Sequence, residues 1–208
     1  VAVTAEVNVA SGGLGLFIVG LPDNTIKESH ERIQAAFENS GFKLQAKKTV
    51  VNLAPADLRK EGSQYDLPIA IGILTATEQI QTDMLADSMF IGELSLNGKL
   101  RPVKGVLPIV AMARDMGIKR VFMPEENISE GAVVEGVETI GVGSLIEICE
   151  ILSGAPSRVL DACSYVAGDG LVSMVGNEYP RHYTKMFWDG LRAEGEEVPV
   201  NLVRSAWL

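Results

Sequence analysis

Residues 92–99 carry glycines and a lysine in an order close to that of a phosphate-binding loop. The segment reads Gly92-Glu93-Leu94-Ser95-Leu96-Asn97-Gly98-Lys99. Five residues separate its two glycines where a phosphate-binding loop has four, and Leu100 replaces the hydroxyl residue that would hold Mg²⁺. Asn97-Gly98 is instead a strong signal for a β-hairpin. We therefore predict a hairpin here, and we expect this chain to bind neither ATP nor another cofactor.

Other residues that could take part in chemistry have simpler structural interpretations. The glycines between residues 12 and 20 miss the spacing of a dinucleotide-binding turn, because Ile18 occupies the third required position. His30 lies in the charged run 27–32, which is typical of a solvated helix face. Cys149 lies in an apolar helical stripe, where a small buried thiol is expected. With two cysteines and two histidines in the chain, we expect neither a zinc site nor a disulfide scaffold.

Charge and composition limit the class of protein. The 208 residues include 18 basic and 27 acidic side chains, for a net charge of −9, which argues against wholesale coating of a DNA duplex by this chain alone. The basic residues form scattered pairs that we expect to be solvated, although a shared positive face is an open alternative. These pairs are Lys47-Lys48, Arg59-Lys60 and Arg101 with Lys104.

Hydrophobic residues make up 47% of the chain, which is enough to bury a core. The longest apolar runs are far shorter than the roughly 18 residues that a membrane span requires. Val1 opens directly into an alternating segment without an initiator methionine or a leader, so we expect the chain to be cut from a longer one. We expect a protein of the reducing cytoplasm with no membrane partner.

Residues 1–154 alternate strand-like and helix-like segments with short turns, which predicts one mixed domain of helices and strands ending near Gly154. The capping-box pattern Thr25–Glu28 predicts the start of a helix that stops at Ser40-Gly41, and Asp66 is expected to cap the next helix. The predicted helices are 25–40, 67–77, 106–116, 129–134 and 144–152, and the predicted strands are 3–9, 16–21, 49–53, 90–94, 99–103, 120–123 and 139–142.

Residues 155–208 differ in composition, since they contain both tryptophans and three of the four tyrosines. Two elements are predicted there, a helix over 183–191 and a strand over 200–203. So short a piece would not close a core of its own. We therefore expect a C-terminal appendage and not an independent domain.

Five segments of residues 1–154 occur in a characteristic order: Val19–Asp23, Lys27–Arg32, Val51–Gly62, Tyr65–Ala70 and Gly92–Gly98. Together they closely resemble the N-terminal domain of the YifB/ComM family of magnesium-chelatase-like AAA+ ATPases. The resemblance implies an α+β fold of the ribosomal-protein-S5-domain-2 type, shared with the Lon protease domain, placed before an AAA+ motor that assembles as a ring. Family members are often described as ATP-dependent proteases, and ComM-type members are implicated in DNA branch migration.

The relation to Lon allows peptidase chemistry to be tested on these residues. A Lon-type site needs a serine whose hydroxyl is activated by a lysine amine. By the resemblance, the serine position falls on or next to Asp66 and the lysine position falls on Leu107, so both catalytic side chains are expected to be missing. Ser63 and Lys104 remain as a shifted pair that a loop could bring together. The preferred interpretation is a Lon-like fold that lost its dyad.

The appendage has a resemblance of its own. It is similar to an interior stretch of family 31 glycoside hydrolases, which implies that Asp161 matches the nucleophilic aspartate and Arg204 a substrate-binding arginine. The second carboxylate of such a retaining mechanism would lie beyond Leu208. A glycosidase barrel also takes about 250 residues. The matching segments are 160–162, 176–180 and 201–207.

These observations predict a non-catalytic N-terminal accessory domain of a YifB/ComM-type AAA+ protein, which serves substrate or DNA engagement or ring assembly. The expected partners are the AAA+ module, further copies in a hexamer and, as an open alternative, DNA. ATP and Mg²⁺ are expected only for the motor, outside this chain. One alternative is an ATP-dependent Lon-like serine peptidase that uses Ser63 and Lys104. Another is a truncated family 31 α-glycosidase that uses Asp161 and Arg204.

Overall fold

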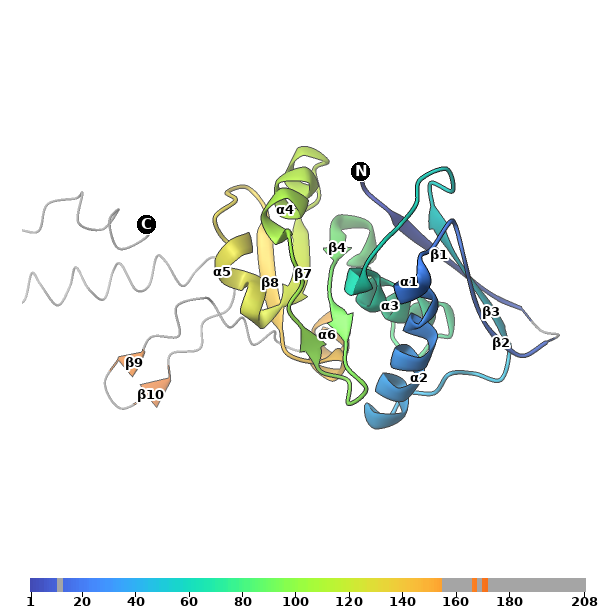
Figure 1. Cartoon of the computed structure of the whole chain (residues 1–208). Coiled ribbons are helices and arrows are strands. Elements are labelled where there is room, and N and C mark those ends of the chain that lie inside the picture. Colours follow the sequence, from blue (N-terminus) through green and yellow to red (C-terminus); the bar gives the residue numbers. More distant parts are fainter. Residues whose placement is uncertain (11–12, 155–165, 168–169, 172–208) are drawn as a thin grey trace, which may run out of the picture.

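The structure is a computed structural model, and it describes residues 1–10, 13–154, 166–167 and 170–171 (Figure 1). Within 166–171, β9 (Val166–Ala167) pairs antiparallel with β10 (Gly170–Leu171). The helix and strand predicted within 183–203 lie outside the described residues, as do Asp161 and Arg204.

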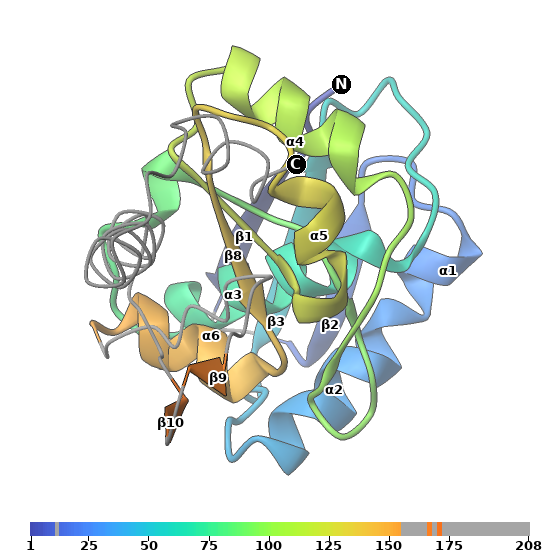
Figure 2. The same cartoon turned by 90° about the vertical axis from the view of Figure 1, so that its left-hand side faces the viewer.

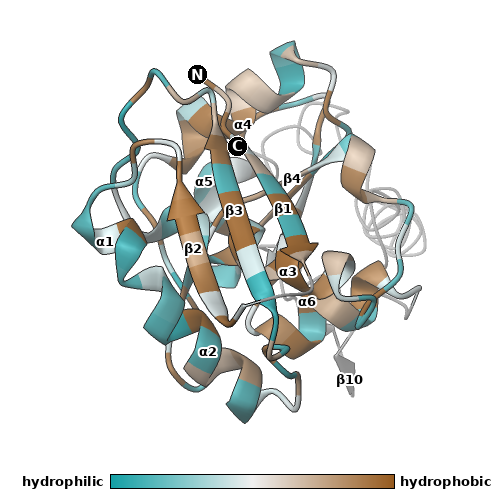
Figure 3. Ribbon diagram, turned by 90° about the vertical axis from the view of Figure 1, so that its right-hand side faces the viewer, coloured by the Kyte–Doolittle hydropathy of each residue, from teal (hydrophilic) through white to brown (hydrophobic). Residues whose placement is uncertain are grey.

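The first sheet contains β1 (Thr4–Ala10), β3 (Lys48–Ala54) and β2 (Gly15–Val19), in the order β1-β3-β2. β1 runs antiparallel to β3, whereas β2 runs parallel to it. Successive side chains of a strand point to opposite faces, so Val51 and Leu53 are buried while Lys48 is exposed on the outer face. Figure 3 shows this outer face uncovered.

Three helices lie near this sheet: α1 (Asn24–Lys27), α2 (Ser29–Asn39) and α3 (Asp66–Ala76). α3 is buried along most of its length and lies between the first sheet and the rest of the domain (Figure 1). Gly72 allows this packing, because a Cβ at that position would lie 2.7 Å from Cγ2 of Val7 on β1.

The second sheet is entirely parallel, with β4 (Ser88–Phe90), β7 (Arg120–Pro124) and β8 (Glu138–Val142) in the order β4-β7-β8. Such sheets are covered on both faces. One face packs through Phe122 into the core that includes α3 and α6 (Leu145–Leu152). The other packs through Val121 into a second core with α4 (Val106–Asp115) and α5 (Ile128–Gly131) (Figure 2).

A hairpin of β5 (Glu93–Leu94) and β6 (Leu100–Arg101) carries Asn97-Gly98 in its turn, where Gly98 has a φ of +78°. The predicted hairpin is confirmed. The predicted strand over 90–94 is wrong in its extent, because Phe90 belongs to β4 of the parallel sheet. The connection between these strands contains Gly92, whose N–H donates to the carbonyl of Gln64.

The predicted helix start at Thr25 is also wrong. Asp23 is the N-cap residue, and its Oδ1 accepts the Ile26 N–H at 2.8 Å. The chain then turns at Glu28, so that two helices replace the single predicted one. An aspartate at this position competes with the hydroxyl of Thr25 as a cap, because both side chains suit that role.

The remaining short elements are three 3₁₀ turns: η1 (Ser63–Tyr65), η2 (Leu85–Asp87) and η3 (Glu125–Asn127). Helices and small sheets together confirm the α+β class, whereas the named S5-domain-2 type stays a prediction. Among the described residues, no helix is both long and apolar enough to cross a membrane.

Candidate functional site

Polar groups are buried most deeply where α3 begins. Asp66, the first residue of α3, is inaccessible to solvent, as is Ser29 at the start of α2. Arg32 follows one turn later on α2, and Leu94 belongs to β5. The site therefore joins two helices and the hairpin around one carboxylate.

The Asp66 carboxylate accepts four hydrogen bonds. Its Oδ2 accepts from Nε of Arg32 at 2.7 Å and from the Leu94 N–H at 3.2 Å. Its Oδ1 accepts from Nη2 of Arg32 at 2.9 Å and from the Ser29 hydroxyl. A carboxylate has about four lone-pair sites, so its acceptor capacity is used up. No acceptor site is left for an incoming substrate.

Asp66 was expected to cap its own helix, and the structure corrects this. It is the first helical residue, the N-cap position belongs to Tyr65, and no side chain caps the helix there. The carboxylate turns instead toward Arg32 and Leu94, because the bidentate guanidinium is a stronger partner than the free N–H groups of a helix end.

Arg32 is fixed as tightly as Asp66. Besides the paired carboxylate, its Nη2 donates to the carbonyl of Thr25 at 2.9 Å and to the Ser29 hydroxyl at 3.1 Å. The hydrogen bond to Asp66 raises the pKa of the guanidinium above its usual value, an effect that burial partly opposes. Arg32 is therefore charged throughout the working pH range, and it serves as a fixed anchor and not as a proton donor.

Lys60 forms a second buried polar junction. Only 2% of this residue is exposed, and its Nζ donates to the carbonyl of Gly20 at 3.0 Å and to that of Pro55. The prediction that Lys60 is solvated is therefore wrong, whereas its neighbour Arg59 is exposed as expected. A lysine can bury its charge when carbonyl oxygens surround the ammonium group.

Asp23 reinforces this junction from the other side. Beyond capping α1, its Oδ2 accepts the Gly62 N–H at 3.2 Å, and its own N–H donates to the carbonyl of Lys60 at 3.0 Å. Asp23 and Lys60 thus join the segment after β2 to the segment that leads to η1. This junction positions the loop that carries Ser63.

The Ser63 hydroxyl donates to the carboxylate of Glu93, on β5. The second oxygen of Glu93 lies 3.9 Å from Nη1 of Arg101. Lys104 is exposed in the connection between β6 and α4, and within the described part of the chain no hydrogen bond joins it to Ser63. The structure does not bring the two residues together as a hydrogen-bonded pair, so their catalytic role stays a prediction.

Comparison with known proteins identifies the domain. A family described as subunit ChlI of Mg-chelatase matches residues 5–127, which is more than half of the chain. The chain belongs to this family. The matched residues include most of β1, all of β2 and β3, α1 to α4, the hairpin and both buried junctions, so the site lies within the part of the chain that matches the ChlI family.

Two relatives are similar to this chain over most of its length. It is 41% identical over 152 residues to competence protein ComM of Haemophilus influenzae, covering 73% of this chain and 30% of the relative. It is 37% identical over 180 residues to YifB of Escherichia coli, an uncharacterized protein, covering 85% of this chain and 35% of the relative. The chain therefore spans about a third of the length of these relatives.

A more distant likeness connects the ChlI-like domain to a protease. The chain is 30% identical over 136 residues to Lon protease 2 of Bacillus subtilis, covering 64% of this chain and 24% of the protease. At the position that the resemblance assigns to the Lon lysine, Leu107 lies in the first turn of α4, and its N–H donates to Oε1 of Glu130 at 3.0 Å. Leu107 has no amine and Asp66 no hydroxyl, so the loss of the Lon dyad at these positions stays a prediction from the resemblance.

The match to YifB extends beyond residues 1–154 into the appendage. The match to YifB covers 85% of the chain, which is more than residues 1–154 alone can supply, so it extends into 155–208. The family 31 glycoside hydrolase resemblance is not supported by these comparisons. Asp161 and Arg204 stay outside the described residues, and their roles were predictions from that resemblance alone.

The other candidate residues have structural positions. His30 is half-buried on α2, 3.8 Å from a carboxylate oxygen of Glu31, and the segment 92–99 forms the β5–β6 hairpin. Among the described residues, no group of three or more His, Cys, Asp or Glu side chains could hold a metal ion. Apart from Lys60, the paired basic residues are exposed, as predicted: Lys47, Lys48, Arg59, Arg101 and Lys104.

Cys149 is buried in α6, as its apolar stripe predicted, and burial raises the pKa of its thiol to about 12. We expect Ellman's reagent at pH 8 to label Cys149 in a Cys163→Ser variant only after urea is added, because thiolate is the reactive form. Since the folded pKa lies above the ordinary value of 9.0, the neutral thiol favours folding below pH 9, and this contribution is lost as pH rises toward 12. Rapid labelling of the native protein would contradict the burial.

Proposed function

We propose that this chain is the non-catalytic accessory domain of a magnesium-chelatase-like AAA+ ATPase of the YifB/ComM type. In this proposal the domain engages substrate or joins the ring, and a motor outside this chain hydrolyses ATP with Mg²⁺. Assembly as a hexamer, with the AAA+ module as its immediate partner, is part of the proposal. Membership of the ChlI family and the one-third share of the relatives' length support it.

The observation that carries the non-catalytic role is the state of Asp66. By the resemblance to Lon, the nucleophile position falls on or next to Asp66, yet Asp66 is fully buried and all its acceptor sites are used by Arg32, Ser29 and Leu94. A group of this kind stabilises a fold but has no free electron pair to offer a substrate. Ser63 is paired with a carboxylate, which is a much weaker base than a neutral lysine amine.

The test compares this chain with a Ser63→Ala variant by labelling with a fluorophosphonate probe, with casein hydrolysis measured in parallel. We expect neither labelling nor hydrolysis, and we expect calorimetry to detect no ATP binding at micromolar affinity. The active peptidase domain of an intact Lon enzyme serves as the positive control. Labelling that the Ser63→Ala substitution abolishes would overturn the non-catalytic proposal in favour of the peptidase alternative.

The outer face of the first sheet supports a protein partner for this domain. Four large apolar residues on or beside β2 are exposed by 44% to 72%: Leu14, Phe17, Val19 and Leu21 (Figure 3). On the outer face of the three strands, Lys48 is the one cation, and its Nζ lies 5.8 Å from the centre of the Phe17 ring. Nucleic acid needs several cations to replace its counterions. A protein surface, such as that of the AAA+ module, therefore fits this face better than DNA.

Assembly is tested in the longer protein that contains the motor. We expect Phe17→Asp to weaken ring formation, measured by light scattering, because it places a charge within an apolar contact. Leu96→Asp is the matched control, since Leu96 is similarly exposed, at 59%, but belongs to the hairpin turn. Equal assembly of the Phe17→Asp and parent proteins would remove this face from the proposal.

A further inference from the structure

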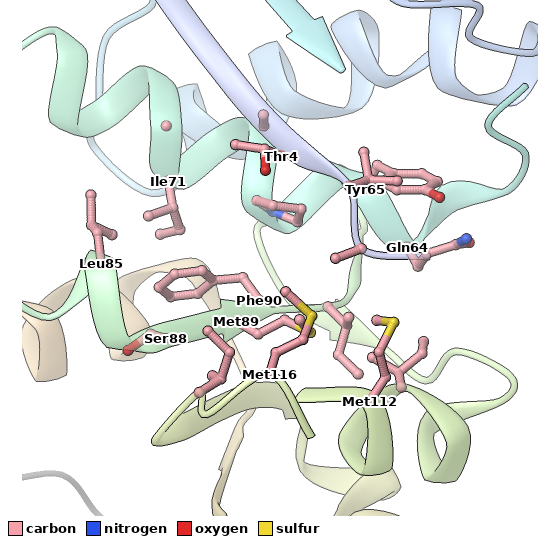
Figure 4. A pocket seen from close by; sticks show the side chains of 18 of the residues that line it. Thr4, Gln64, Tyr65, Ile71, Leu85, Ser88, Met89, Phe90, Met112 and Met116 are labelled. Atoms are coloured by element: carbon pink, nitrogen blue, oxygen red, sulfur yellow. The ribbon is translucent and has the colours of Figure 1, made fainter. Parts of the chain in front are cut away.

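A groove of about 610 Å³ separates the first sheet and α3 from β4 and α4. Figure 4 shows Thr4 and Ile71 on one side of this groove and Met112 and Met116 on the other. Phe90 and Met89, from β4, lie along its length. The groove is apart from the buried cluster of Asp66, although Gln64 and Tyr65 of η1 line one end of it.

Two strand edges border the groove. β4 is the edge strand of the parallel sheet, and β1 is an edge strand of the first sheet. Residues 1–5 and 88–91 both line the groove, and among the described residues no strand pairs with either edge on this side. Unpaired edge strands present rows of free N–H and C=O groups, which can pair with an added strand. The groove thus offers two short strand edges, Thr4–Ala5 of β1 and Ser88–Phe90 of β4.

The side chains that line the groove are uncharged. The chain carries a net charge of −9, yet the groove contains no Asp, Glu, Lys, Arg or His side chain. Apart from the terminal amine of Val1, phosphates and carboxylates would lose their hydration there without gaining a charged side chain as partner, which disfavours nucleic acid, nucleotides and acidic peptides as ligands. Charge complementarity therefore selects an uncharged occupant. An extended peptide of apolar and small side chains satisfies both the lining and the free strand edges.

The side chains of the groove suit variable occupants. Met89, Met112 and Met116 have flexible thioethers, which adapt to different apolar partners. Ser88, also in the lining, has a buried Oγ without a hydrogen-bond partner in the described part of the chain. Met112 lies on α4 and Met116 is the C-cap residue of this helix, four residues later, so both side chains lie on the same side of its last turn.

We propose that this groove binds an extended, uncharged apolar segment of a client polypeptide, which adds as a strand to the open edge of β4. Backbone hydrogen bonds would give affinity, and alternate side chains would enter the methionine-lined wall. This names the substrate class for the engagement role proposed above, and it rests on that role only in assigning the segment to a client. Binding itself is a property of the described groove.

The test uses this chain and a dansyl-labelled peptide of alternating valine and serine, followed by fluorescence anisotropy. We expect saturable binding, and we expect Met112→Glu to weaken it by about tenfold or more, because the carboxylate would be desolvated against the peptide. Met116→Glu is the second variant, chosen because Met116 is 53% exposed and tolerates a charge in the free protein. Leu107→Glu is the control, since Leu107 lies on the same helix, is 42% exposed and does not line the groove.

A peptide N-methylated at every second residue tests the strand geometry, because it lacks the N–H donors on one edge. We expect it to bind at least about tenfold more weakly than the unmodified peptide. The proposal is overturned by an absence of binding, by equal binding of the methylated peptide, or by affinity unchanged in both methionine variants. Groove-dependent dimerisation of the chain would also overturn it, in favour of a second copy as occupant. ATP binding or labelling of Ser63 would defeat the proposed function without changing these titrations.

Discussion

The Asp66→Ala variant is expected to have a free energy of unfolding about 3–5 kcal/mol lower than that of the parent chain. The substitution leaves the Arg32 guanidinium, whose side chain is 18% exposed, without its carboxylate partner. It also removes the acceptor of the Ser29 hydroxyl and of the Leu94 N–H. This exceeds the roughly 0.5–2 kcal/mol expected for loss of a helix cap, so the measurement separates a buried anchor from a cap.

Urea denaturation of the two proteins at neutral pH provides the measurement. Asp115→Ala is the matched control, because Asp115 pairs with Arg114 at 2.9 Å but is 68% exposed, and such pairs contribute at most about 1 kcal/mol. A double variant, Arg32→Met with Asp66→Leu, should recover much of the loss, since removing both charges avoids an unpaired buried ion. A change below about 1 kcal/mol in Asp66→Ala would show that the cluster is not an anchor.

Local patterns in the sequence predict most elements of the domain. The β5–β6 hairpin follows from Asn97-Gly98, α4 ends before Gly117, and Ser144 caps α6 by accepting the Glu147 N–H. Each of these signals depends on residues that are close together in the sequence, so the element can be predicted without knowing the fold. The α+β class and the ChlI family follow from the same segments, because their order along the chain is characteristic.

The site was predicted less well because its contacts join distant segments. Asp66 and Arg32 are 34 residues apart, and nothing near either residue indicates that they pair. Phe90 was assigned to the hairpin, although its partner strand β7 begins 30 residues later, at Arg120. The groove depends on where β1 and β4 lie relative to each other, and the hydrophobic periodicity of the sequence does not indicate how separate elements are placed. The Arg59-Lys60 pair shows the same limit, because nothing in the local sequence indicates that Lys60 is buried while Arg59 is exposed.

Replacing Lys60 is expected to destabilise the domain strongly, by about 3–5 kcal/mol for Lys60→Ala. The variant leaves the carbonyls of Gly20 and Pro55 without this donor and opens a cavity where the buried Lys60 side chain packs. The Gly20 backbone packs directly against that of Leu53, where an added Cβ would lie 2.2 Å from the Leu53 carbonyl oxygen, so it has little room to shift toward another donor. The loop between Pro55 and η1 should therefore loosen first.

Lys60→Met separates the two contributions, since it keeps most of the side-chain volume but removes the ammonium donors. We expect it to lose about 2–3 kcal/mol, which isolates the hydrogen bonds from the cavity. Arg59→Ala is the matched control, because the neighbouring Arg59 side chain is 73% exposed and pairs with the exposed Glu61 at 3.1 Å, so its removal should change stability by less than about 1 kcal/mol. Urea midpoints of the four proteins, compared at equal transition slope, give the result. If Lys60→Met were as stable as the parent, the ammonium group would be solvated and the buried junction between the segments after β2 and β3 would not exist.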